Sequence, residues 1–280
     1  MISVLQALKK RFGGEEPPAG PSRECRLTEA YLGCECLYIP AGTKQKDVRQ
    51  LFAEAESQCA GTGTVPVLIS VNNNLAETLF DNAGIQYPEG DTVTEADRRK
   101  IAEFRDRLIS QCSDSDAEEF FRAGEERVAQ ELAEEQFPRE MWEGETVCFD
   151  DVIPEMGAFV DLGTLKSGEL LLAKIPAYEP WHISAWLPTG GWNECPAPKE
   201  MLAVAKRWYE KYRAVICCVT SSELEFRVSA PPADKTDAMT LAKEFYFFCE
   251  DRLHQYGSEN SIATIAAGVT HSPFWYFWWD

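Results

Sequence analysis

Histidine is scarce in this sequence, and its cysteines lack the spacing of a metal site. The three histidines, His182, His254 and His271, are dispersed along the chain. Among the ten cysteines, Cys34-Glu-Cys36 and Cys217-Cys218 do not have the Cys-x-x-Cys spacing of a zinc knuckle or a redox turn. We therefore expect no metal, no cofactor and no disulfides, and we interpret the cysteines as small hydrophobic residues of the interior.

Basic residues are also few. Lys and Arg number 27 against 46 Asp and Glu, which gives a net charge of −19. Nucleic-acid affinity requires a basic stripe that releases counterions from the phosphates, and anionic membrane surfaces attract the same residues. We therefore expect no nucleic-acid partner and no membrane partner. A basic protein partner is compatible, because a negative field accelerates encounter with positive surfaces. The oligomeric state stays open.

Long apolar runs and familiar catalytic motifs are absent as well. No stretch approaches the roughly 20 apolar residues of a membrane span. In residues 1–12 the charges follow a broken apolar pattern, whereas a signal peptide has them before a continuous one. We therefore expect a cytoplasmic protein. The sequence contains no nucleophile elbow, phosphate loop, dinucleotide fingerprint or His-Glu-x-x-His, which favours binding over catalysis.

What is present is ordinary globular composition, with 45% hydrophobic residues in 280 positions, enough for one or two domains. In the first half, Cys34–Ile39 and Val65–Val71 are typical of strands, and the second is typical of a strand buried on both faces. Helices are predicted over 45–60, after Asn72 as N-cap, and from Thr94. This alternation predicts an α/β region over 1–150, with a domain boundary near Asp150.

Nearly half of the net charge lies in one segment. Residues 114–145 hold twelve acidic and three basic side chains, a net −9. Phe120, Phe121, Val128 and Leu132 recur there at helical spacing, so we predict an amphipathic helix. Its acidic side is either a solvated surface or a docking face for a basic partner.

The second half, 151–280, is the predicted C-terminal domain, and over about 175–280 we expect a mostly antiparallel sheet flanked by helices. We expect a hairpin formed by 157–162 and 169–175, and an antiparallel pair formed by 214–219 and 224–228. Further strands are predicted at His182–Leu187 and Phe274–Trp279, with helices over 198–212, 234–254 and 261–267. From 182 onward the order resembles a ferredoxin-like split βαβ with one extra helix.

Seven of the eight tryptophans fall in 181–280. Three phrases there, Gly190-Gly-Trp-Asn-Glu-Cys-Pro196, Trp208-Tyr-Glu-Lys-Tyr212 and Trp275-Tyr-Phe-Trp-Trp-Asp280, resemble a bacterial family catalogued as domain of unknown function 4253. The resemblance covers residues 170–280. A typical member reads Phe-Cys-Pro-Asp where this chain has Phe248-Cys249-Glu250-Asp251. The resemblance implies a fold-level grouping and no established chemistry.

The loop at 190–196 is the main candidate site. Trp192 and Asn193 offer a stacking face and hydrogen bonds, and Glu194 is a candidate acid or base. Cys195 precedes a helix start, where the dipole lowers a thiol pKa, and His182 is the nearest base in sequence. The alternative interpretation is a rigid turn with Trp192 as a core plug and a buried Cys195.

The aromatic C-terminus adds a second candidate surface, which ends at Asp280. Alternation places Trp275, Phe277 and Trp279 on one face of the terminal strand. Two functions follow from these features. The first is a non-catalytic protein-binding module for a basic partner, of immunity type by analogy with small acidic proteins that neutralise basic toxins. The alternative is a cysteine-dependent hydrolase or transferase centred on Cys195.

Overall fold

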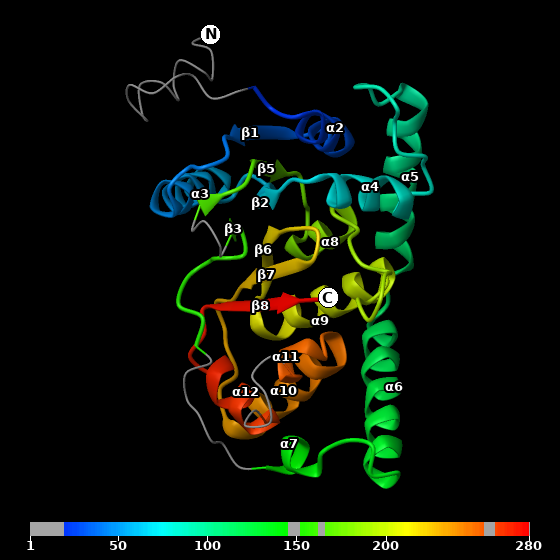
Figure 1. The fold of residues 1–280 in the computed structure, drawn as a ribbon, viewed down its shortest axis with the longest axis vertical. Coiled ribbons are helices and arrows are strands. Elements are labelled where there is room, and N and C mark those ends of the chain that lie inside the picture. Colours follow the sequence, from blue (N-terminus) through cyan, green and yellow to red (C-terminus); the bar gives the residue numbers. More distant parts are fainter. Residues whose placement is uncertain (1–19, 145–151, 162–165, 255–260, 280) are drawn as a thin grey trace.

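The computed structural model describes residues 20–144, 152–161, 166–254 and 261–279. The predicted domain boundary near Asp150, the opening segment 1–12 and the candidate Asp280 lie outside the described residues. The molecule is elongated, with the strands of one sheet stacked along its long axis (Figure 1). The mixed α/β class predicted from the sequence is confirmed.

A six-stranded sheet in the order β1-β5-β2-β6-β7-β8 forms the centre of the fold. The neighbours β2 and β6 are parallel, and the other neighbouring pairs are antiparallel. Strands from both halves of the sequence therefore pair within one sheet. Its strands are β1 (Glu35–Ile39), β2 (Val65–Ser70), β5 (Leu170–Ile175), β6 (Val215–Val219), β7 (Glu223–Arg227) and β8 (Phe274–Trp278).

The predicted hairpin of 157–162 with 169–175 is wrong. A short pair, β3 (Val160–Asp161) and β4 (Lys166–Ser167), occupies part of that segment, while β5 inserts between β1 and β2. β5 is apolar at nearly every position, so burial between two strands and under both faces stabilises it more than a hairpin edge would.

Helices cover both faces of the sheet. α3 (Gln45–Cys59) packs one core together with β2, β5 and the segment 156–160. The larger core on the other face includes residues of most other helices. These are α2 (Arg23–Leu32), α4 (Asn73–Asn82), α5 (Glu95–Gln111), α6 (Asp114–Ala133), α7 (Arg139–Glu143), α8 (Ile183–Trp186), α9 (Pro198–Tyr212), α10 (Lys235–Phe248), α11 (Asp251–His254) and α12 (Ile262–Val269).

The strand predicted at His182–Leu187 is also wrong. A 3-10 turn, η1 (Pro180–His182), leads directly into α8. Pro180 fixes a helical φ at the first position, and Leu187 N–H donates to the Ile183 carbonyl to close the turn. The ferredoxin-like topology is not confirmed, because its first strand is helical and β2 lies between β5 and β6.

The long helix predicted over 234–254 breaks at Cys249. The backbone there is extended, and the Cys249 thiol donates to the Trp278 carbonyl at 3.0 Å. The Trp279 indole donates to the Phe248 carbonyl at 3.3 Å. These contacts with the end of the chain take the place of the next helical turn, and α11 begins two residues later.

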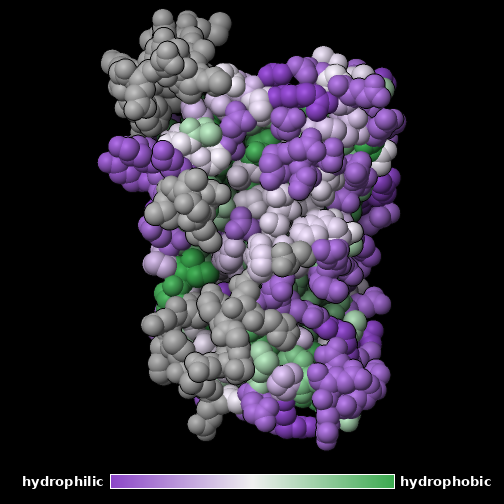
Figure 2. Space-filling model, viewed as in Figure 1, coloured by the Kyte–Doolittle hydropathy of each residue, from purple (hydrophilic) through white to green (hydrophobic). Residues whose placement is uncertain are grey.

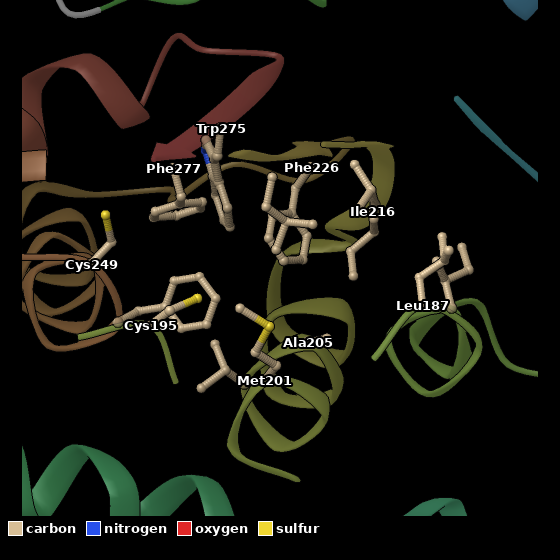
Figure 3. Packing of buried hydrophobic residues seen from close by; sticks show 14 of the residues in the cluster. Leu187, Cys195, Met201, Ala205, Ile216, Phe226, Cys249, Trp275 and Phe277 are labelled. Atoms are coloured by element: carbon tan, nitrogen blue, oxygen red, sulfur yellow. The ribbon is translucent and has the colours of Figure 1, made fainter. Parts of the chain in front are cut away.

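Other predictions are confirmed. β6 and β7 pair antiparallel, and the Asn72 side chain caps α4 by accepting from Leu75 N–H at 2.8 Å. In the terminal strand, Trp275, Phe277 and Trp279 are buried while the residues between them are half-buried. Figure 3 shows Trp275 and Phe277 facing the same core as Phe226 of the neighbouring β7.

Candidate functional site

The loop at 190–196 is attached to the end of α4. The Asn82 side chain donates to the Pro188 carbonyl at 2.7 Å and to the Gly190 carbonyl at 3.2 Å. Asn82 lies more than 100 positions before the loop, so no sequence pattern pointed to this contact. The loop is therefore held by a side chain of α4 in addition to the hydrogen bonds of its own turn.

Inside the loop the backbone folds on itself. Gly191 N–H donates to the carbonyls of Cys195 and Pro196 at 3.2 and 3.1 Å, and Cys195 N–H donates to the Trp192 carbonyl at 2.9 Å. Gly190 has φ +89°, and a Cβ there would collide with the Pro196 carbonyl oxygen. These bonds satisfy the backbone without a ligand, which is typical of a rigid turn.

Cys195 lies inside this turn and not on the surface. It is 6% exposed and lies beside Met201 in the core that includes Phe277 (Figure 3). Burial raises the pKa of its thiol well above the ordinary value, and the neighbouring Cys249 raises it further. Desolvation therefore outweighs the helix start that favours the thiolate.

The other candidate residues of the loop have different surroundings. Asn193 and Glu194 are exposed, and Trp192 is half-buried against the main core. His182 lies in η1 with its ring 4.2 Å from that of Trp181, and burial lowers its pKa. The structure thus gives these residues different surroundings, with the Cys195 thiol buried and Asn193 and Glu194 exposed.

The phrases that carry the family resemblance are largely core residues. Trp208 is fully buried, and its ring packs on Phe226, Phe248 and Trp275 at 5.0–5.7 Å. Tyr212 is also buried, and its hydroxyl donates to Asp237 at 2.9 Å. The shared motif therefore specifies how α9 packs on the sheet.

The acidic segment predicted from the sequence forms α6, and its inner face is apolar. Phe121, Gly124 and Val128 are buried. Gly124 lies directly against Phe247 of α10, where a Cβ would come within 2.6 Å of the ring. This close approach lets α6 lie flat along the C-terminal helices (Figure 1).

Ion pairs with the C-terminal region border this packing. Lys199 of α9 pairs with Asp116 at 2.8 Å, and Lys206 pairs with Asp114 at 2.5 Å. Arg127 pairs with Glu250 beyond α10. Exposed pairs of this kind contribute little each, so they orient α6 more than they stabilise it.

The outward side of α6 is strongly acidic. We call its exposed carboxylates, together with those of the turn that follows, the acidic face; they are Asp114, Glu118, Glu119, Glu125, Glu126, Glu134 and Glu135. Arg122 is an exposed base among them, and it pairs with Glu126 at 2.6 Å. Figure 2 shows hydrophilic residues over the side of the molecule where α5 and α6 lie.

Among the described residues, no cluster of three or more His, Cys, Asp or Glu side chains could hold a metal ion. Within the same parts of the chain, no helix is long and apolar enough to span a membrane.

The comparisons with known proteins identify the C-terminal region. Residues 171–280 match the family model described as Domain of unknown function (DUF4253). The match includes the 190–196 loop, α9 and β8, whereas α6 and its acidic face lie before it. No curated protein and no solved structure matches the chain.

Proposed function

We propose that the chain, with its C-terminal DUF4253 region, is a non-catalytic protein-binding module whose acidic face docks a basic protein partner. This proposal rests on the difference between the packed side and the exposed side of α6. One side is fixed to the C-terminal helices by Phe121 and Gly124, and the other presents five exposed carboxylates, which two more on the following turn extend. A rigid element with a strong net negative charge steers and orients an oppositely charged protein.

Among the described residues, few large hydrophobic side chains are exposed, so docking through an apolar surface has little support. Val152 and Tyr178 are the exposed large hydrophobic residues among them, and neither belongs to α6. Charge is therefore the property by which a partner would recognise this side. A basic toxin neutralised by an immunity-type protein is one partner with this chemistry.

The enzyme alternative centred on Cys195 has weaker support. A nucleophilic cysteine requires a thiolate and access to substrate. Cys195 is buried, and its pKa is raised by desolvation. We therefore favour binding.

Site-specific photo-crosslinking in the native host tests the proposal. A photoreactive residue is placed at Ala123, an exposed position of α6, and at Ala102, an exposed position of α5, as control. We expect crosslinks from position 123 to a protein with a basic surface and none to that protein from position 102. Raising the salt concentration should weaken the crosslink, because exposed charges are screened.

A charge-matched pair of variants sharpens the test. Changing Glu118, Glu119, Glu125 and Glu126 to glutamine should abolish the crosslink. Changing Glu89, Glu95, Glu103 and Asp106, which are also exposed, to their amides removes the same charge elsewhere and should preserve it. Equal loss in both variants, or a partner with an acidic surface, contradicts the proposal.

A further inference from the structure

Two thiols lie side by side on the edge strand of the sheet. Within the described part of the chain β1 is an outer strand paired with β5, and Cys34 directly precedes it while Cys36 lies within it. The two thiols are two positions apart in the sequence and hydrogen-bond to each other. Both side chains are half-buried and free.

A guanidinium stands near this pair. Arg105 of α5 acts electrostatically on Cys34 and on Tyr31, and it packs over the Trp186 ring at 3.1 Å from the ring centroid. The Arg105 Nε is buried without a hydrogen-bond partner. The Cys36 hydrogen bond and Arg105 lower the pKa of Cys34 against the opposing effects of burial and Glu29.

One cysteine of the pair, Cys34, lines a cavity. A pocket of about 430 Å³ is lined by Cys34 together with Gly33, Gln58, Lys174 and a third cysteine, the buried Cys59. Cys34 therefore borders a space that is open to solvent, and Cys36 follows two positions later outside the lining. This arrangement, an accessible thiol beside a second thiol, is the one found in cysteines that sense oxidants.

We propose that Cys34 and Cys36 form a peroxide-reactive dithiol, in which Cys34 attacks hydrogen peroxide and Cys36 then closes a reversible disulfide. The Cα separation of two residues on a strand is roughly 6.6 Å, which lies at the upper end of the range that a disulfide spans. An edge strand adjusts more easily than a central one, and a strained disulfide is readily reduced again.

The chemistry balances in two steps. The Cys34 thiolate attacks one peroxide oxygen, the O–O bond breaks, and the departing hydroxide takes a proton to leave as water, which gives the sulfenic acid. The Cys36 thiol loses its proton and attacks the Cys34 sulfur, and the S–O bond breaks with release of a second water. Two electrons pass from the two sulfurs to the peroxide.

The negative charge around the cysteine pair favours a neutral oxidant over an anionic one. Glu29 and Glu35 act on the pair, and the whole chain carries a net charge of −19. Anionic disulfides such as oxidised glutathione are repelled by such a field, whereas neutral hydrogen peroxide is not. We therefore assign a neutral peroxide as the substrate class.

The test is peptide mapping of the full-length reduced protein after brief treatment with stoichiometric hydrogen peroxide. Trypsin releases both cysteines on one peptide, residues 27–44, so the disulfide appears as a loss of two hydrogens. We expect this product to form before oxidation elsewhere, and a thiol reductant to reverse it. Cys112, a half-buried thiol at the C-cap of α5 whose pKa is raised by burial, is the internal reference.

Three variants separate the roles. Cys36→Ser should stop the reaction at a Cys34 sulfenic acid, which dimedone traps, and Cys34→Ser should abolish the product. Arg105→Gln should shift the pH midpoint of Cys34 alkylation upward. In the unaltered protein at pH 7, Cys34 should alkylate at least about tenfold faster than Cys112.

The proposal is overturned if Cys112 or another cysteine oxidises first, or if Cys34 and Cys112 alkylate at the same rate. It also fails if oxidised glutathione modifies Cys34 faster than peroxide does. Because the first measurements use the unaltered chain, the result does not depend on how any variant folds. It is also independent of the partner crosslinks from α6.

Discussion

The indole Nε1 of Trp208 donates a 2.8 Å hydrogen bond to the carboxylate of Glu244, a buried residue of α10. The other oxygen of that carboxylate accepts two N–H bonds from Arg207, at 2.9 and 2.7 Å. One charged group on α10 thus fixes two consecutive residues of α9. The contact satisfies the indole of the main aromatic core, where an unpaired polar group would destabilise the fold.

Glu244→Ala should lower the free energy of unfolding by about 3 kcal/mol, because it leaves the Arg207 charge and the Trp208 N–H without their partner. Urea unfolding followed by tryptophan fluorescence measures this. The control is Glu210→Ala, which removes an exposed carboxylate of α9 and should change the free energy by less than about 0.5 kcal/mol. Equal effects of the two substitutions would show that the buried carboxylate is dispensable.

A second buried carboxylate makes stability depend on pH. Glu225 of β7 is 1% exposed and accepts N–H bonds from Gly157 and Ala158 at 2.9–3.2 Å. Burial raises its pKa to about 7, although these N–H bonds and Arg49 oppose the shift. The folded protein therefore holds this proton more tightly than the unfolded chain does.

Because the folded pKa is raised, the contribution of Glu225 is fully present at low pH and is lost as the pH rises through about 7. Between pH 5 and 8, the unfolding free energy of Glu225→Gln should fall less than that of the unaltered protein, by on the order of 3 kcal/mol. Denaturant titrations at several pH values measure the difference. Glu210→Gln serves as control, and the prediction fails if Glu225→Gln keeps the original slope.

Gly124→Ala should destabilise the packing of α6. Alanine in a helix ordinarily stabilises it by about 1 kcal/mol over glycine, but here its Cβ would meet the Phe247 ring at 2.6 Å. Overpacking of this kind costs about 1–3 kcal/mol. Hydrogen exchange of α6 and thermal unfolding measure the effect. Adding Phe247→Leu should restore part of the loss, and a stabilised Gly124→Ala would contradict the packing described.

The loop at 190–196 offers a matched pair of substitutions. Gly190 and Gly191 both have positive φ, +89° and +79°, so alanine at either position is strained by about 1–2 kcal/mol. Only Gly190→Ala also brings a Cβ onto the Pro196 carbonyl oxygen. We therefore expect Gly190→Ala to be the more destabilising in urea unfolding. Equal losses in unfolding free energy would mean that the turn accommodates the added Cβ at Gly190 at no additional cost.

Local patterns predicted the elements whose stability is local. The Asn72 cap, the amphipathic spacing of α6, and the alternation of Trp275 and Phe277 each depend on neighbours within a few residues. The 182–187 segment failed because its short apolar run fits either a strand or a helix. Pro180 at the first turn and the tertiary packing of the segment favour the helical conformation.

The sequence by itself determined the α/β class, the acidic charge, the position of the acidic helix and the resemblance of residues 170–280 to their family, since these depend on composition, periodicity and order along the chain. Only the tertiary structure decided that β5 separates β1 from β2, that Asn82 attaches the 190–196 loop, and that the charge of Arg105 acts on Cys34. These contacts join residues tens to more than a hundred positions apart. They arise from the packing of whole elements, which no local pattern encodes.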